Sequence, residues 1–133
     1  MTLYPLKGLV IPLNYAFLHP RDEGTGKAIP KKPKHVVNAA VEYTLARAES
    51  GVPFGLVSSV RGRYVQFYLD DTSKLNREYL VIDARVAFEF AIHRELKGEA
   101  FVSLNNVLNR DYQIAEGYPM PPRSLNGGVS FSY

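Results

Sequence analysis

The chain has no Cys and no Trp among its 133 residues. The absence of Cys excludes a disulfide framework, a thiolate metal site and a thiol nucleophile, but leaves the compartment open because many periplasmic and outer-membrane proteins also lack Cys. No stretch approaches the run of about 18 apolar residues that a membrane-spanning helix requires. Residues 1–18 also lack the basic start, unbroken apolar segment and cleavage site of a secretion signal. These absences predict neither a membrane helix nor an export signal.

The chain also has little excess charge of either sign. Its 16 Lys and Arg residues stand against 13 Asp and Glu, which gives a formal net charge of +3, and the basic residues are scattered along the sequence. The composition therefore predicts no nucleic-acid partner. The length allows one ordinary domain, residues 1–133.

Apolar residues at every second position are abundant. Those at even positions from Leu80 to Ile92 alternate with a mixed row that contains Asp83, Arg85 and Glu89. A period of two is typical of a strand with two unlike faces. The same pattern predicts six strands and no helix, so we expect an all-β antiparallel meander. The strands are expected over residues 9–18, with Pro12 marking a bulge or an edge, and over 35–46, 54–65, 80–93, 97–106 and 124–133.

The connections between these strands are expected to alternate in length. Those at 19–33, 69–78 and 107–122 are long, and those around 47–51 and 94–97 are short. An antiparallel meander with long loops at one end is typical of transmembrane β-barrels. Charge placement agrees, because a Lys or Arg facing lipid at mid-bilayer costs about 2 to 4 kcal/mol. The charges within the strands all fall in the polar rows, at Glu42, Arg61, Arg63, Asp83, Arg85, Glu89 and Glu99.

A soluble β-sandwich would also keep charges off its buried rows. The pattern therefore leaves two interpretations open, a segment of a transmembrane β-barrel and a soluble antiparallel β-domain that binds a small apolar ligand. The C-terminus bears on this choice. Its last strand resembles the C-terminal assembly signal of bacterial outer-membrane barrels, in which a polar residue, a Gly two positions on and two hydrophobic or aromatic residues close the chain. The matching positions are Asn126, Gly128, Phe131 and Tyr133.

The preceding residues resemble the end of TonB-dependent outer-membrane receptors. Residues 104–112 correspond to that family's Asn-Leu-Phe-Asp-Arg-Asp-Tyr run, and residues 117–123 correspond to its Gly-Tyr-Pro-x-Pro-Gly-Arg run. Residues 30–35 resemble the family's Pro-x-x-Pro-x-His start of a strand, and Asp83 with Arg85 suits its Val-Asp-x-Arg strand. The departures are conservative and consist of Val107 and Leu108 for Leu-Phe, Asn109 for Asp, and Pro122 for Gly.

The resemblance implies a ligand-gated transporter of the outer membrane. Such a receptor has a barrel of about 22 strands around an N-terminal plug domain and takes up a scarce nutrient such as a ferric siderophore or cobalamin. It is assembled by the barrel-assembly machinery and is energised by TonB, which pulls on the N-terminal TonB box. The polar row would face the lumen and the plug. Its charged members are Arg61, Arg63, Asp83, Arg85 and Glu89.

Six strands are only a fragment of such a barrel, since the smallest common membrane barrels have eight. The plug, the TonB box, a signal peptide and most strands have no counterpart in the sequence. We therefore expect the C-terminal portion of a receptor, completed by strands from the same or a separate chain and unable to transport alone.

Several side chains are candidates for contacts or chemistry. Tyr112 and Tyr118, in the last long loop, are expected to contact an extracellular ligand, and an interfacial aromatic girdle is expected from Tyr15, Phe17, Tyr64, Phe67, Tyr68 and Tyr79. The densest basic patch, Lys27, Lys31, Lys32 and Lys34 with His35, is interpreted as a solvated loop that could meet an anionic siderophore or lipopolysaccharide. We predict no enzyme, cofactor or metal site. No Gly-x-Ser-x-Gly motif is present, His19, His35 and His93 are far apart, and Asp70 and Asp71 supply too few ligands for Ca²⁺.

Overall fold

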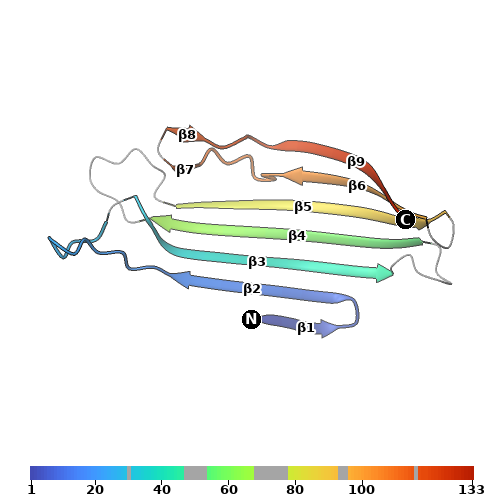
Figure 1. The fold of residues 1–133 in the computed structure, drawn as a ribbon, viewed down its shortest axis with the longest axis horizontal. Helices are drawn as coiled ribbons and strands as arrows, with labels where there is room; N and C mark the ends of the chain where they lie inside the picture. Colours follow the sequence, from blue (N-terminus) through green and yellow to red (C-terminus); the bar gives the residue numbers. More distant parts are fainter. Residues whose placement is uncertain (30, 47–53, 68–77, 93–95, 116) are drawn as a thin grey trace.

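The chain folds as an antiparallel sheet of seven strands in the order β1-β2-β3-β4-β5-β6-β9 (Figure 1). The structure is a computed structural model that describes residues 1–29, 31–46, 54–67, 78–92, 96–115 and 117–133. The predicted all-β antiparallel meander is confirmed. The strands of the sheet are β1 (Thr2–Leu6), β2 (Leu9–Phe17), β3 (Pro33–Ala46), β4 (Phe54–Phe67), β5 (Glu78–Ala91), β6 (Lys97–Asn105) and β9 (Ser124–Ser132). A separate hairpin pairs β7 (Gln113–Ala115) with β8 (Tyr118–Pro119).

All six predicted strands are present, and β1 is an addition that the prediction missed. It pairs with β2 through a tight turn at residues 7–8. Gly8 has a φ of 82° in this turn, and a Cβ there would collide with the backbone carbonyl of Thr44 at the end of β3. The Gly8 carbonyl also accepts a hydrogen bond of 2.8 Å from the Thr44 amide. Glycine therefore allows both the turn and its close approach to β3.

Pro12 lies in an interior strand, whereas the sequence suggested an edge or a bulge. The ladder between β2 and β3 has the pairs Val10↔Glu42 and Leu13↔Ala39 on either side of it, in one unbroken register. The Leu13 amide donates to the carbonyl of Met1, on the β1 side. Since successive amides point in opposite directions, the missing N–H of Pro12 falls on the β3 side. The strand tolerates a local gap in its ladder without a shift of register.

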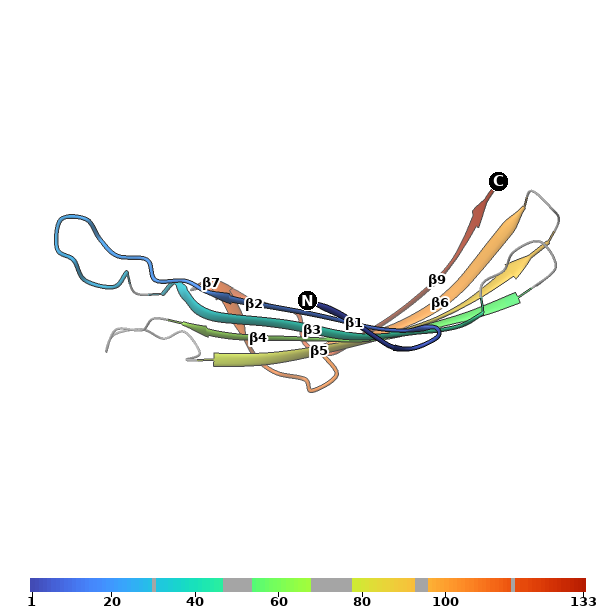
Figure 2. The same ribbon diagram turned by 90° about the horizontal axis from the view of Figure 1, so that it is seen from below.

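The connections alternate in length as predicted. The strand bounds leave long intervals at residues 18–32, 68–77 and 106–123 and short ones at 7–8, 47–53 and 92–96. β2, β4 and β6 run toward one edge of the view, and β1, β3 and β5 run toward the opposite edge (Figure 1). Viewed along its edge, the sheet is a single curved layer (Figure 2). Among the described residues there is no helix long and apolar enough to cross a membrane.

The register divides the side chains of this sheet between two unlike faces. The face that we call the apolar face carries the apolar rows, and many of its large side chains are exposed. They include Leu13, Tyr15, Phe17, Val41, Tyr43, Phe54, Leu56, Val60, Leu80, Val86, Phe88, Val102, Leu125, Val129 and Phe131. The opposite face, the polar face, carries the charged rows.

The hydrophobic burial of the described residues lies on the polar face. Val65, Phe67, Tyr79 and Val81 form one cluster at the long-loop end of β4 and β5, and Val65 is only 1% exposed. Two partly buried side chains, Val36 and Tyr112, pack against this cluster. The larger apolar rows thus remain uncovered, while a small core forms between the polar face and the loop that follows β6.

Candidate functional site

The polar face carries an array of charges on adjacent strands. Arg61 on β4 approaches Glu42 on β3, with 3.4 Å between Nη2 and Oε1. Arg85 on β5 donates to Glu99 on β6 at 2.6 Å, and its guanidinium carbon lies 4.6 Å from the centre of the Phe101 ring. Both pairs are cross-strand contacts, as the register requires for side chains that share a face.

All five predicted lumen-facing residues lie on this one face. Arg63 pairs with Asn38 and Val81, and Glu89 pairs with Gly55 and Glu99. Arg61 and Asp83 are direct partners across β4 and β5. The structure therefore brings the five together in one surface, and their exposure to a barrel lumen stays a prediction.

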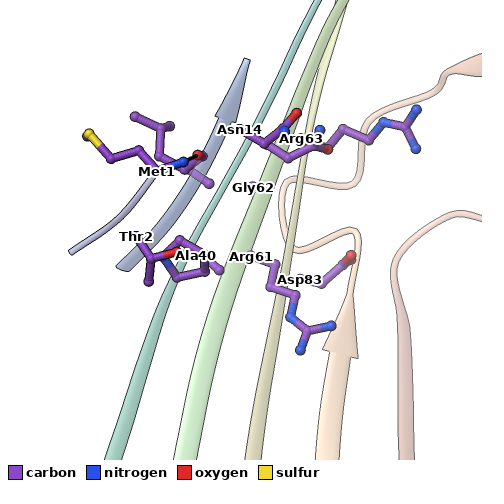
Figure 3. A pocket seen from close by; sticks show the side chains of 12 residues that line it. Met1, Thr2, Asn14, Ala40, Arg61, Gly62, Arg63 and Asp83 are labelled. Carbon is purple, nitrogen blue, oxygen red and sulfur yellow. Dashed lines mark hydrogen bonds between the residues drawn. The ribbon is translucent and has the colours of Figure 1, made fainter. Parts of the chain in front are cut away.

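Two hollows lie along the polar face. The larger, of about 470 Å³, runs from the N-terminal residues across β2, β3 and β4 to Asp83. Figure 3 shows that the side chains of Arg61 and Arg63 diverge within it and that Asp83 lies beside Arg61 on the neighbouring strand. The second, of about 270 Å³, is bounded by the charged residues Glu42, Arg61, Asp83 and Arg85. The second hollow suits a hydrated or hydrogen-bonding partner because its wall includes the Arg61–Glu42 ion pair.

An Asn-centred turn fastens the last long loop to the polar face. Asn106 is 3% exposed and has a φ of 49°. Its side chain accepts from the Arg110 amide at 2.9 Å and donates to the carbonyls of Arg110 and Pro121 at 2.9 and 3.2 Å. The Asn106 amide in turn donates to the Asp83 carboxylate at 2.8 Å. Asp83 is therefore an anchor for this loop as well as a charge on the sheet.

Asn109 adds a second fixed point to the same loop. It too has a φ of 49°, and its side-chain oxygen accepts a hydrogen bond of 3.0 Å from the Arg123 amide. Asn tolerates the left-handed region better than other residues with side chains. The sequence predicted a long loop over residues 107–122 but no built turn. Asn106 and Asn109, whose residue type tolerates the left-handed region, were the available signal.

The two predicted ligand-contact tyrosines lie in different surroundings. Tyr112 packs on Tyr79 with 4.7 Å between ring centres and an angle of 40° between the ring planes. Burial, and then the charge of Asp83, raises the pKa of the Tyr112 phenol, whereas Arg63 acts in the opposite direction. Tyr118, in the β7–β8 hairpin, is 73% exposed. The structure thus gives Tyr112 a packing role and leaves Tyr118 accessible, and contact of either with a ligand stays a prediction.

The structure contradicts two positions of the expected aromatic girdle, and the interfacial role of the others stays a prediction. Tyr15, Phe17 and Tyr64 do lie on the apolar face at the long-loop end. Phe67 and Tyr79 instead lie on the polar face, where each is 6% exposed in the core cluster. Both belong to the row of Val65 and Val81, so alternation along the strand places them opposite Tyr64. Tyr68 lies outside the described residues.

A second group of aromatic rings occupies the other end of the apolar face. Phe54 stacks on Phe88, Phe88 on Phe90, and Phe90 meets Phe131 edge to face with 6.3 Å between ring centres. Between the two aromatic groups, the apolar rows of the described strands contain no charged residue. Ser58, a polar residue within them, directs its hydroxyl to the Tyr43 carbonyl at 3.4 Å.

The four residues of the predicted assembly signal fall on both faces of the last strand. Asn126 and Gly128 lie on the polar face opposite Ser103 and Phe101, and Phe131 belongs to the apolar row. The Phe101 ring covers Gly128 so closely that a Cβ there would lie 2.9 Å from it. Tyr133 follows β9 and is fully exposed. Their role in assembly stays a prediction.

The remaining candidates can be placed in part. His35 shares a hydrogen bond of 2.9 Å with the Tyr15 hydroxyl, and His19 accepts one of 2.7 Å from Arg21. No group of three or more potential metal ligands occurs within the described ranges. His93, Asp70 and Asp71 lie outside them.

Comparison of the chain with protein-family models, with curated proteins and with solved structures gives no match.

Proposed function

We propose that this chain is the C-terminal β-barrel segment of a TonB-dependent outer-membrane receptor, which takes up a nutrient such as a ferric siderophore or cobalamin. The observation that carries the membrane part of the proposal is the uncovered apolar face. Its large side chains are exposed along β2, β3, β4, β5, β6 and β9, while the charges gather on the opposite face. Lipid is the surrounding that makes such a distribution favourable, because water would penalise the exposed apolar surface.

The height of the apolar band supports a membrane surrounding. Phe54 and Tyr64 mark the two aromatic groups on the apolar row of β4 and are ten residues apart. At about 3.3 to 3.4 Å per residue they are separated by about 33 Å along the strand. Strands of membrane barrels tilt by about 35 to 45°, which projects this length to about 23 to 27 Å along the membrane normal. This height agrees with the apolar band of such barrels, which is about 25 Å tall and lies between two aromatic girdles.

The edges of the sheet support incorporation into a larger barrel. β1 and β9 are its outermost strands. Edge strands present unpaired backbone donors and acceptors, and each such group costs several kcal/mol in lipid. Neighbouring strands, from the same or a separate chain, would satisfy them. The polar face would then line the interior, where paired charges and hollows can meet a plug domain.

The receptor class is supported by the resemblance of residues 104–123 and of the closing residues to TonB-dependent receptors. The alternative, a soluble β-domain with a small apolar ligand, requires a second layer over the apolar face or closure around it. Over the described residues, the sheet is a single layer whose apolar face is exposed. We therefore favour the receptor segment.

A fusion experiment tests the proposal. The upstream part of a TonB-dependent receptor that lacks its own last strands is joined to this chain, and surface labelling measures assembly in the outer membrane. We expect the fusion to assemble and the same fusion without residues 131–133 to fail. A control that replaces Ser130 and Ser132, on the polar row of β9, by Ala should assemble. Equal surface levels with and without residues 131–133 would reject the assembly signal. A chain that is monodisperse without detergent and unfolds cooperatively would favour the soluble alternative.

A further inference from the structure

A continuous stack of rings leaves the apolar face at the end of β2. Tyr15 stacks on His35 with 6.1 Å between ring centres, His35 lies 5.1 Å from Phe17, and Phe17 stacks on His19 at 6.0 Å. Arg21 closes the series, because its Nε donates to Nε2 of His19 at 2.7 Å. We call these five residues the ring stack. It joins an apolar aromatic end to a cationic end.

The cationic end is held by an ordered hairpin. The Leu18 amide donates to the Lys34 carbonyl, which extends the ladder beyond Phe17, and Arg21 pairs with Ala28 in an isolated bridge. The tip is fixed by the Asp22 carboxylate, which accepts from the Thr25 amide and hydroxyl at 2.7 and 2.8 Å. Figure 1 shows this segment projecting from the sheet beyond β2 and β3. Arg21 is therefore presented from a fixed backbone position.

The segment also contains the whole net charge of the chain. Between residues 19 and 35, five Lys and Arg residues stand against two Asp and Glu, a surplus of +3 that equals the formal charge of all 133 residues. The rest of the chain is neutral. A local positive surplus at one end of an apolar face favours an anion at that end.

The position of the ring stack identifies the anion's surroundings. Tyr15 lies at the level of Tyr64 in the sheet register, so it belongs to the aromatic group at the long-loop end. Phe17 and His35 form the next pair on the same face, two residues farther along β2, and His19 and Arg21 extend beyond them. In a bilayer, the layer next to the apolar band contains the lipid headgroups. Arg21 would thus stand at headgroup depth, with rings leading back to the acyl chains.

We propose that the ring stack binds the phosphate group of a membrane lipid. The Arg21 guanidinium uses Nε for His19, and its terminal nitrogens carry further donors in the planar fork that suits phosphate oxygens. Tyr15 and Phe17 would lie along the first part of the acyl chain. The inference rests on the proposed membrane function, since only insertion places a lipid phosphate at this level.

The test uses the full chain in uncharged maltoside micelles with phosphatidic acid as the probe. Nuclear magnetic resonance shifts of the Arg21 side chain and of the two histidine rings report binding. In variants that lack Arg21, the shifts of the rings in the stack report it instead. We expect Arg21→Gln to weaken binding about tenfold or more and Arg21→Lys to restore part of it, because Lys keeps the charge without the fork. Lys27→Gln removes the same charge from the same hairpin and should weaken binding less than about twofold.

The outcomes distinguish a lipid phosphate from free phosphate as the ligand. Inorganic phosphate should bind at least about tenfold more weakly than phosphatidic acid, because it lacks the acyl chains. Equal affinity for both probes, or equal loss in Arg21→Gln and Lys27→Gln, overturns the proposal. If Arg21→Gln binds like the unmodified chain while the apolar face contacts lipid, the lipid site is rejected and the membrane function stands. If binding depends on Arg21 but the apolar face is in water, the membrane function is rejected and the phosphate contact of Arg21 is kept.

Discussion

The two faces of the sheet share one backbone, yet their hydrophobic residues have opposite surroundings. On the apolar face, large side chains such as Val60 and Val86 are about half exposed. On the polar face, Val65, Tyr79 and Ala87 are buried, and the first two belong to the core cluster. For these hydrophobic residues, exposure therefore follows the face of the sheet. This inversion is the arrangement expected where lipid contacts one face and protein or water the other.

The largest expected effect comes from placing a charge on the apolar face. Val60→Arg should lower the free energy of unfolding in lipid vesicles by about 2 to 4 kcal/mol, because the guanidinium would face lipid near mid-bilayer. Ser59→Arg, one residue away on the polar face beside Glu42, should change it by less than about 1 kcal/mol. Denaturant unfolding of both variants in the same vesicles measures the difference. Equal tolerance of the two charges would remove the distinction between the faces.

The next effect concerns the loop fastened to the polar face. Asn106→Ala removes the buried side chain that makes three hydrogen bonds, and it places Ala at a positive φ. We expect a loss of about 2 to 4 kcal/mol in the free energy of unfolding. Asn109→Ala has the same backbone conformation but loses one hydrogen bond to an exposed site, so it should cost about 1 kcal/mol. Similar losses in both variants would show that the buried bonds contribute little.

A smaller effect is expected from packing among the rings of the apolar face. A Cβ at Gly98 would collide with the Phe90 ring, whereas a Cβ at Gly62 would meet open space. Gly98→Ala should therefore cost about 1 to 3 kcal/mol, and Gly62→Ala should stay within about 0.5 kcal/mol. Thermal unfolding in vesicles compares them. A neutral Gly98→Ala would indicate that the Phe90 ring turns aside freely.

The smallest effect concerns the ion pairs. A double-mutant cycle on Arg85 and Glu99 should give a coupling of about 0.5 to 1 kcal/mol, since the pair is partly exposed and is supported by the Phe101 ring. The same cycle on Arg61 and Glu42 should give a few tenths, because the Arg61 side chain is 69% exposed. Both couplings should fall as salt is added. A stronger coupling for Arg61 than for Arg85 would contradict the geometry.

The sheet could be predicted because its signal is repeated. Six strands of nine or more residues each carry a row of apolar side chains at a period of two, and the connection lengths alternate with them. β1 has only five residues, and β7 and β8 have three and two. Alternation over so few positions cannot be distinguished from chance, so these strands were missed for lack of length.

The polar-face charges could also be predicted, because strand alternation alone assigns Arg61, Asp83 and Arg85 to one row. Phe67 and Tyr79 were wrongly assigned to the aromatic girdle because they are aromatic, although alternation along their strands places them on the polar face. Both rings occupy the charged row, and the long loop supplies Tyr112 to cover them. That contact joins residues far apart in the sequence and depends on the Asn106 turn, which strand periodicity does not describe.

The most direct measurement compares two labels on adjacent residues of β4. The chain has no Cys, so Val60→Cys and Ser59→Cys each create a single labelling position. The labelled chain is joined to the Cys-free upstream part of a receptor, as in the fusion above, so that neighbouring strands complete the barrel. A fluorophore at residue 60 should then be quenched by brominated acyl chains in lipid vesicles, and one at residue 59 by a water-soluble quencher. This is the result that a barrel segment with lipid on its apolar face predicts. Quenching of both labels by the water-soluble reagent, with no effect of brominated lipid at residue 60, would contradict it.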